Sequence, residues 1–236
     1  MNEEYRYEIK FVLSEYELLE SFRFLKSINA FKPYPDRDVN SLYFDTIDFQ
    51  CVKDNLSGIS DRHKVRLRWY DDIDNNVFLE IKKRVGRLGS KDKYSIKNLS
   101  KRKILEYNID EINKKVFNYF HKNYQFNNLL NEYYIPILFV NYRREYYESD
   151  IFISNEHKTD RLRVTIDKKI NFRNISLNFP IKHYNEVIYN EYIMEIKFPI
   201  YMKDEVSRIL KSFSLTPKRH SKYLTGMAKL GYVTYI

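Results

Sequence analysis

The chain has 236 residues, 43% hydrophobic and 31% charged, and this balance excludes an intrinsically disordered protein. It carries 41 Lys and Arg against 32 Asp and Glu, a formal net charge of +9 that favours a polyanionic partner such as nucleic acid, phosphate chains, nucleotides or an anionic membrane. The single cysteine, Cys51, excludes an internal disulfide framework and a cysteine zinc cluster.

The start of the sequence lacks the basic and then apolar order of a signal peptide, and no apolar run approaches the roughly 18 residues that a membrane helix needs. We therefore expect a cytoplasmic protein with no membrane segment in this chain. The sequence shows no fixed-period repeat and no low-complexity tract, so residues 1–236 are predicted to form a single domain.

The first predicted strand covers residues 4–13 and has a charged side. Arg6, Glu8 and Lys10 share one face, because side chains in a strand point to opposite faces with period two. Ser14 then begins a helix, because a glutamate three residues later completes a capping box.

A second strand is predicted over residues 39–46, followed by an irregular piece around Cys51. A hairpin then covers about residues 62–84, with its turn at 71–76. In both strands of the hairpin charged residues alternate with apolar ones, and the charged set is Lys64, Arg66, Arg68, Glu80 and Lys82.

The rest of the chain continues with strands and helices. A loop is predicted at 86–90, and a polar helical insertion packed on a sheet at about 99–134. The other predicted elements are strands over 91–96, 137–147, 161–170 and 191–198, and helices over 203–213 and about 219–230.

Five of these strands pair a charged face with a strongly apolar face. For any one strand, the solvated side of an ordinary antiparallel sheet explains the pattern. Faces dominated by Arg and Lys fit that explanation poorly, because a solvated face usually mixes charge signs and short polar groups. If helices cover the apolar faces, the charged faces point inward and line a barrel that holds a ligand. Buried cations need an anion, most naturally a polyphosphate, and the few carboxylates suit a divalent metal that bridges phosphate oxygens.

Eight short motifs occur in order along the chain. They are Arg6-x-Glu8-x-Lys10, Leu42-Tyr43-Phe44-Asp45-Thr46, Lys64-x-Arg66-x-Arg68, Glu80-x-Lys82, Tyr142-Arg143-Arg144, Arg161-x-Arg163-x-x-x-Asp167, Glu195-x-Lys197 and Ser221-Lys222-Tyr223. Over nearly the whole chain this set resembles the VTC domain, the polyphosphate polymerase branch of the triphosphate tunnel metalloenzymes in the CYTH-like superfamily. The resemblance implies an α+β fold: an antiparallel eight-stranded β tunnel barrel with a basic lumen and helices packed outside.

The resemblance further implies a metal-dependent polyphosphate polymerase that moves the γ-phosphate of ATP onto a polyphosphate chain, with Mn²⁺ or Mg²⁺ as cofactor. The residues expected to bind phosphate in catalysis are Lys10, Arg66, Arg68, Lys82, Arg143, Arg163 and Lys222. Further substrate contacts are expected from Arg6, Lys93, Arg161, Lys197, Ser221 and Tyr43. Glu195 is the expected metal ligand and Glu8 a second candidate.

Several alternatives stay open at the level of sequence. Related hydrolases and cyclases begin E-x-E-x-K, whereas this chain has Arg6 at the first position, which favours polyphosphate synthesis or binding. Glu8 and Glu80 are each either a metal ligand or an ion-pair partner of Arg66 or Arg68. The other candidate functions are a polyphosphate-binding module without turnover and a metal-dependent triphosphatase.

The expected partners are ATP and polyphosphate or triphosphate. Nucleic-acid binding is disfavoured because the basic residues alternate inside strands and do not cluster with exposed aromatic residues. The sequence does not identify a partner in a membrane complex.

Overall fold

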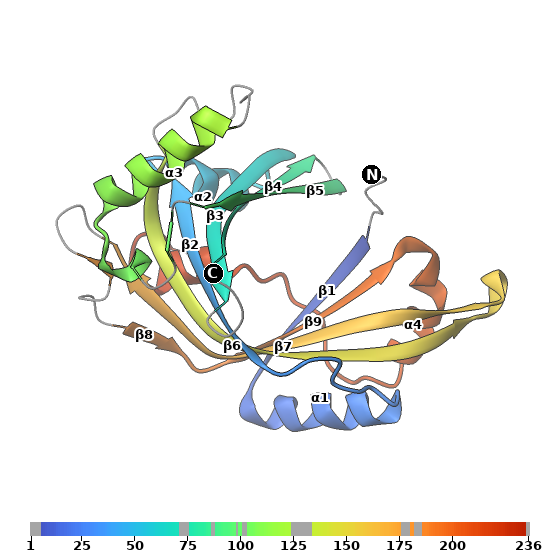
Figure 1. Cartoon of the computed structure of the whole chain (residues 1–236). Helices are drawn as coiled ribbons and strands as arrows, with labels where there is room; N and C mark the ends of the chain where they lie inside the picture. The colour runs from blue at the N-terminus through green and yellow to red at the C-terminus, as the bar shows by residue number, and fades with distance from the viewer. Residues whose placement is uncertain are drawn as a thin grey trace. The chain divides into compact units, whose positions relative to one another are not determined.

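Antiparallel strands dominate the structure, a computed structural model drawn in Figure 1. It describes residues 6–70, 76–85, 88–97, 99–100, 103–123, 134–175, 180–181 and 186–234. The elements in chain order are β1 (Arg6–Leu13), α1 (Glu15–Ser27), β2 (Arg37–Asp45), α2 (Gln50–Leu56), β3 (Asp61–Tyr70), β4 (Val77–Val85), β5 (Leu88–Ile96), η1 (Ile104–Glu106), α3 (Ile109–Asn123), β6 (Ile135–Ile153), η2 (Ser154–Glu156), β7 (Lys158–Asn174), β8 (Glu186–Tyr189), β9 (Tyr192–Pro199), η4 (Ile200–Met202), α4 (Lys203–Leu210) and α5 (Lys222–Lys229). The short helices η1, η2 and η4 are 3₁₀ helices.

The strands follow the order β1-β9-β7-β6-β2-β3-β4-β5, and β8 pairs with β7 beside this path. The sheet is therefore nine-stranded among the described residues, and it is not closed, since its path begins at β1 and ends at β5. The expectation of an eight-stranded closed barrel is wrong on both counts. β8 has only four residues, too few for a periodic signal, and closure depends on strand tilt and stagger, which alternation of residues does not encode.

The chain divides into two compact units. Unit 1 comprises Met1–Arg37, Tyr142–Ile170 and Tyr189–His220, and unit 2 comprises Asp38–Asn141, Asn171–Ile188 and Ser221–Ile236. The strands β6 and β7 contribute residues to both units. The assignment of the whole chain to one domain stays a prediction.

Unit 1 buries the apolar faces of β1, β7 and β9 against helices. Leu18, Phe24 and Leu25 of α1 join Phe11 of β1 and Val164 of β7 in one buried cluster, and Figure 1 shows α1 beside these strands. The predicted capping box is confirmed, because the Ser14 and Glu17 side chains each accept a hydrogen bond from the other residue's backbone N–H. The charged faces of β1, β7 and β9 point away from this core, because successive side chains of a strand alternate between its two faces.

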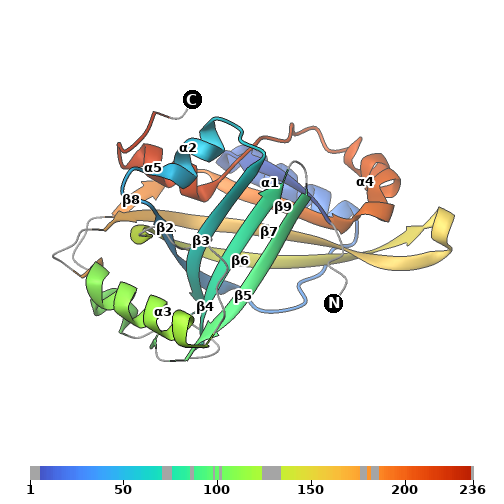
Figure 2. The same ribbon diagram turned by 90° about the horizontal axis from the view of Figure 1, so that it is seen from above.

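In unit 2 the strands β3, β4 and β5 run side by side (Figure 2). Val65, Leu67 and Ile81 are at most 2% exposed, as expected for the apolar faces of β3 and β4. The final helix α5 packs closely in this unit: a Cβ at Gly226 would lie 2.7 Å from both Leu138 and Phe172.

Two local predictions need correction. The irregular piece around Cys51 is helix α2. Its first amide, that of Gln50, donates to the hydroxyl of Thr46, and the next two donate to the Asp45 carboxylate. The loop predicted at 86–90 ends earlier, because β5 already begins at Leu88. The helical insertion contains η1 and α3; its residues 124–133 and the hairpin turn at 71–75 lie outside the described residues. No helix among the described residues is long and apolar enough to span a membrane.

Candidate functional site: two clusters of ion-paired side chains

Cross-strand register assembles a row of polar side chains on one face of unit 2. Tyr43 of β2 stands opposite Arg66 of β3, and Arg66 stands opposite Glu80 of β4. Glu80 in turn stands opposite Lys93 of β5. Directly opposite side chains on antiparallel strands lie close enough to interact, so the register brings residues from four strands together.

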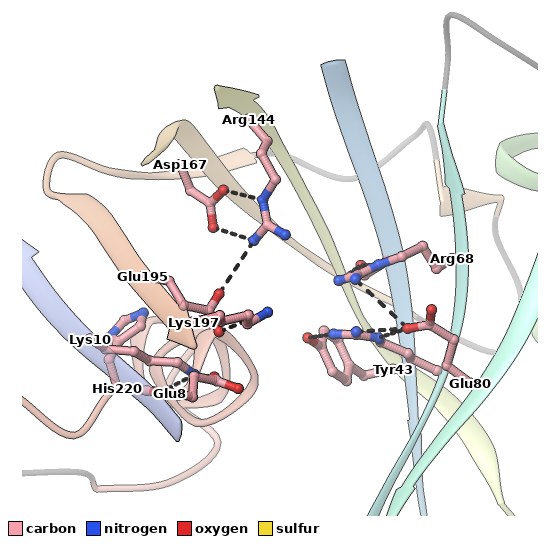
Figure 3. A network of polar contacts seen from close by, with 12 residues as sticks. Glu8, Lys10, Tyr43, Arg68, Glu80, Arg144, Asp167, Glu195, Lys197 and His220 are labelled. Carbon is pink, nitrogen blue, oxygen red and sulfur yellow. Dashed lines mark hydrogen bonds and ion pairs between the residues drawn. The ribbon is translucent and has the colours of Figure 1, made fainter. Parts of the chain in front are cut away.

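Glu80 is the anionic centre of this row, and only 3% of it is exposed. One carboxylate oxygen accepts hydrogen bonds from Nε and Nη2 of Arg66 at 2.9 and 2.7 Å and lies 3.7 Å from Nη1 of Arg68. The other accepts a hydrogen bond from Lys91 at 2.8 Å. Burial alone would raise the pKa of Glu80, but the charges of Arg66, Arg68 and Lys91 outweigh it and hold the pKa far below its usual range. Glu80 therefore stays ionised and fixes three cations on one face. Figure 3 shows its contact with Arg68.

Tyr43 lies buried beside these cations. Its hydroxyl accepts a hydrogen bond from Nη1 of Arg66 at 3.1 Å, and its ring stacks on Tyr223 with 5.0 Å between centroids. Burial would raise the pKa of Tyr43, yet the charges of Arg66 and Arg68 outweigh it and lower the pKa. The hydroxyl of Tyr43 thus faces the cationic row.

Asp45 connects the end of β2 to α2 and α5. Its buried carboxylate accepts hydrogen bonds from the backbone N–H groups of Cys51 and Val52 at 2.8 and 3.1 Å, and from the hydroxyl of Tyr223. Burial and the charge of Asp45 raise the pKa of Tyr223 far above its usual range, so its hydroxyl remains a donor. This contact fixes the first turn of α5 beside β2.

Ser221 and Lys222 therefore have defined positions at the start of α5. Ser221 is the N-cap, and its side chain accepts a hydrogen bond from the backbone N–H of Leu224. Nζ of Lys64 donates to the same hydroxyl at 2.8 Å. Lys64 of β3 thus lies next to the amino-terminal end of a helix, where the helix dipole favours anions.

Unit 1 carries a second cluster, built on the register between β1 and β9. Glu8 stands opposite Lys197, and Lys10 stands opposite Glu195. Nζ of Lys10 lies 2.7 Å from Glu8 and donates to the carbonyl of His220 at 3.3 Å. Lys197 lies 3.2 Å from Glu195. Glutamate and lysine therefore alternate across β1 and β9, and each of the two lysines forms an ion pair with a glutamate.

Glu195 is 6% exposed and lies at the centre of the second cluster. Burial would raise its pKa, but a hydrogen bond with Glu8 and the charges of Lys197, Lys10 and Arg144 outweigh burial and lower the pKa well below its usual range. Among the described residues no group of three His, Cys, Asp or Glu side chains is arranged to hold a metal ion. The touching carboxyl groups of Glu8 and Glu195 still suit a hard cation that takes one or two protein carboxylates and completes its shell with substrate phosphates.

Arg144 is a member of this cluster that the sequence analysis did not select. Its Nε and Nη2 form a two-pronged contact with the fully buried Asp167 at 2.6 and 2.8 Å, and Nη2 lies 3.8 Å from Glu195 (Figure 3). Strand alternation places the neighbouring Arg143 on the opposite face of β6 from Arg144. The motif Tyr142-Arg143-Arg144 does not itself reveal which arginine faces Glu195; the role of Arg143 stays a prediction.

Arg161 and Arg163 share a third carboxylate in unit 1. Arg161 lies 2.9 Å from Glu148 and 3.5 Å from Asp150, and Arg163 lies 3.6 Å from Glu148. The two arginine side chains are 57% and 55% exposed, whereas the Glu148 side chain is 5% exposed. Both arginine side chains are accessible to solvent and are held by a buried carboxylate. The sequence pattern did not indicate Glu148.

The remaining predicted residues have these positions. Arg6 stands opposite Pro199 at the start of β1, and Lys82 stands opposite Lys64 and Lys91. Nζ of Lys93 lies over the ring of Phe78, 3.6 Å from its centroid. The structure thus joins Tyr43, Arg66, Arg68 and Lys93 in the first cluster and Glu8, Lys10, Glu195 and Lys197 in the second.

Comparison with solved structures gives low similarity over most of the chain. The PH1819 protein from Pyrococcus horikoshii OT3 has 13% sequence identity and a TM-score of 0.49, with 95% of this chain and 97% of that chain covered. The Mimivirus capping enzyme triphosphatase has 9% identity and a TM-score of 0.39, with 90% and 91% covered. TM-scores below 0.5 do not establish a shared fold. No curated protein matches the sequence.

The family comparison gives a specific result. Residues 5–231, nearly the whole chain, match the VTC domain. The match contains every residue of both ion-paired clusters. The chain therefore belongs to the VTC domain family.

Proposed function

We propose that the protein is a metal-dependent polyphosphate polymerase that transfers the γ-phosphate of ATP onto a polyphosphate chain. Membership of the VTC domain family supports the proposal. The observation that carries it is the row centred on Glu80, in which Arg66 and Arg68 are held at fixed positions by a buried carboxylate. Fixed cations of this kind bind phosphate oxygens without having to reorganise.

The reaction needs positioning and charge neutralisation more than covalent help from the protein. A terminal oxygen of the polyphosphate chain attacks the γ-phosphorus of ATP, the bond to the bridging oxygen breaks, and ADP leaves with that oxygen. Arg66 and Arg68 would neutralise charge on the transferred group, and the hydroxyl of Tyr43 would donate to a phosphate oxygen. Arginine suits this role because its planar guanidinium stays charged and binds two oxygens at once.

Glu195 and Glu8 would hold the divalent cation, Mn²⁺ or Mg²⁺. When bound, such a cation neutralises phosphate charge and fixes the phosphate groups relative to one another. Lys10, Lys197 and Arg144 surround the two carboxyl groups and keep Glu195 ionised at neutral pH. In the same proposal ATP and polyphosphate are the partners, nucleic acid is not, and the protein works in the cytoplasm.

The direct test incubates purified protein with ATP and Mn²⁺ and measures ADP, free phosphate and polyphosphate chains in the same sample. We expect ADP and chain-bound phosphate to form in equal amounts. Arg66→Ala and Glu195→Gln should abolish chain growth. Lys83→Gln is the matched control, because Lys83 lies on the opposite face of β4 and pairs with Asp92 at 3.4 Å.

Other products would replace the proposal by a defined alternative. Free phosphate without chain growth would identify a triphosphatase. Tight polyphosphate binding without ATP consumption would identify a binding module. Undiminished synthesis by Glu195→Gln would refute the metal role of that carboxylate.

A further inference from the structure

Tyr34 lies in the segment between α1 and β2, where it is held in place and yet remains accessible. Pro33 and Pro35 flank it, and a proline fixes its own φ angle and restricts the residue before it. The ring of Tyr34 meets that of Tyr146 edge to face with 5.5 Å between centroids, and Cζ of Arg37 lies over both rings at 5.5 and 5.7 Å. Tyr34 is nevertheless 43% exposed. These contacts therefore fix an aromatic residue without burying it.

Phe31 adds a second accessible ring. It forms an isolated antiparallel bridge with Glu148 of β6, and the two residues exchange both backbone hydrogen bonds at 2.9 Å. Residues directly opposite each other in an antiparallel pair project their side chains to the same side. Phe31 is 44% exposed, so an accessible aromatic side chain lies on the same side as the Glu148 carboxylate.

The Glu148 carboxylate joins these rings to two exposed cations. It accepts a hydrogen bond from the hydroxyl of Tyr34 at 3.3 Å. Arg161 lies 2.9 Å and Arg163 3.6 Å from the same carboxylate, and both arginine side chains are more than half exposed. The arrangement left no signal in the sequence, because Tyr34 and Glu148 are 114 residues apart. We call this set the Glu148 cluster: Phe31, Tyr34, Glu148, Arg161 and Arg163.

The Glu148 cluster adjoins the cluster around Glu195 along β7. Arg163 stands opposite Lys197 and Thr165 stands opposite Glu195, so the arginines share a face of unit 1 with these residues. From Thr165 to Arg161 the strand rises about 13 Å at the usual spacing of β residues. A nucleotide whose phosphates lie near Lys197 can therefore extend along β7 toward Arg161 and the ring of Tyr34.

We propose that the Glu148 cluster binds the nucleoside end of ATP, with the base stacked on the ring of Tyr34 and the adjoining phosphate on Arg161. This inference rests on the proposed function. The cluster offers aromatic rings beside guanidinium donors, and a nucleotide matches both because it combines a flat base with phosphate oxygens. Inorganic polyphosphate has no aromatic group. The cluster would thus let the protein distinguish its nucleotide substrate from its polyphosphate product, although both carry linked phosphates.

The test titrates the full chain with ATP and with tripolyphosphate by calorimetry, without divalent metal so that neither ligand is consumed. The two ligands have the same number of phosphates and differ in the nucleoside. We expect Tyr34→Leu to weaken ATP binding about tenfold, as for one lost stacking contact, and to leave tripolyphosphate binding unchanged. Tyr34→Phe keeps the ring and should keep most of the ATP affinity. Unchanged tripolyphosphate binding also verifies that the variants are folded.

Tyr16→Leu is the matched control, because Tyr16 is a 70% exposed tyrosine of α1, in the same unit. Equal weakening of ATP binding in Tyr34→Leu and Tyr16→Leu, or equal losses for both ligands in Tyr34→Leu, would overturn the site. A loss in Tyr34→Phe as large as in Tyr34→Leu would overturn base stacking, since the hydroxyl alone would then matter. A single-stranded oligonucleotide that binds more tightly than ATP and loses the same affinity in Tyr34→Leu would overturn the occupant.

The two proposals fail in different ways. Normal polyphosphate synthesis together with unchanged ATP binding by Tyr34→Leu would refute the nucleoside site alone. A wild type that binds ATP, loses the expected affinity in Tyr34→Leu and forms no polyphosphate would refute the polymerase and support the nucleoside site. A wild type that binds neither ATP nor tripolyphosphate would refute both.

Discussion

At the scale of single residues, Glu80 has the largest expected effect because it is a buried anion shared by three cations. Glu80→Gln keeps the shape but removes the negative charge that Arg66, Arg68 and Lys91 share. We expect the free energy of unfolding at pH 7 to fall by about 3 kcal/mol, as for other broken buried ion pairs. Chemical denaturation of wild type and variant measures this difference.

The pH dependence of that difference has a defined sign. The pKa of Glu80 is lowered in the folded state, so in acid the unfolded chain binds its proton first and stability rises with pH. The contribution is fully present above the ordinary glutamate pKa of about 4.3 and is lost as pH falls from there through the folded-state pKa. Asp92→Asn is the control on the opposite face; a loss as large as that of Glu80→Gln would show that burial of Glu80 is not the cause.

The sequence predicted which face of a strand each side chain occupies better than it predicted which residues that side chain contacts. Alternation correctly separated Arg66 and Arg68 from the buried Val65 and Leu67, because one face of a strand is determined by period two alone. It could not select Arg144, because that choice depends on where Asp167 lies on the neighbouring strand. Such pairs follow from register, which is a tertiary property.

At the scale of elements, α5 is positioned by the hydroxyl of Tyr223. Tyr223→Phe removes the hydrogen bond to Asp45 but keeps the ring stacked on Tyr43. We expect a stability loss of about 1–2 kcal/mol, because a buried carboxylate loses one of its donors. Tripolyphosphate binding should weaken as well, because the start of α5 is then less firmly held and the contact between Lys64 and Ser221 is no longer fixed.

Two comparison variants make this prediction specific. Tyr223→Leu should lose more stability than Tyr223→Phe, because the ring contact with Tyr43 is lost as well. Tyr232→Phe removes the same chemical group from a half-buried site, where the hydroxyl donates to Asn174, and should lose less. Equal losses in Tyr223→Phe and Tyr232→Phe would show that Asp45 does not fix α5.

Elements with strong local signals were predictable and the others were not. The capping box at Ser14 identified the start of α1 correctly. The last helix, predicted from about residue 219, begins at Lys222. The N-cap residue of α2 offers no side-chain hydrogen bond; the amides of the first turn donate instead to Thr46 and to Asp45, the last residue of β2. A helix that depends on a residue of another element leaves little local signal.

At the scale of the whole molecule, the chain has a net charge of +9, and some of its cations face one another across strands, as Arg62 and Arg84 do on β3 and β4. A ligand that binds only the folded chain stabilises it, and a polyanion would also relieve repulsion between such cations. We expect tripolyphosphate at about 100 times its dissociation constant to raise the midpoint of thermal unfolding by about 5–10 °C. Differential scanning fluorimetry at constant ionic strength measures the shift.

Salt and ligand type decide whether that shift reports specific phosphate binding. Added sodium chloride should reduce the shift, because it screens exposed cations and weakens the release of bound counterions. Sodium sulfate at the same ionic strength is the control, since it provides a divalent anion without linked phosphates. If sulfate raises the midpoint as much as tripolyphosphate does, the cations respond to any anion. A larger shift with tripolyphosphate that Arg68→Gln abolishes would tie the stabilisation to the row held by Glu80, because Arg68 is the least exposed cation that contacts it.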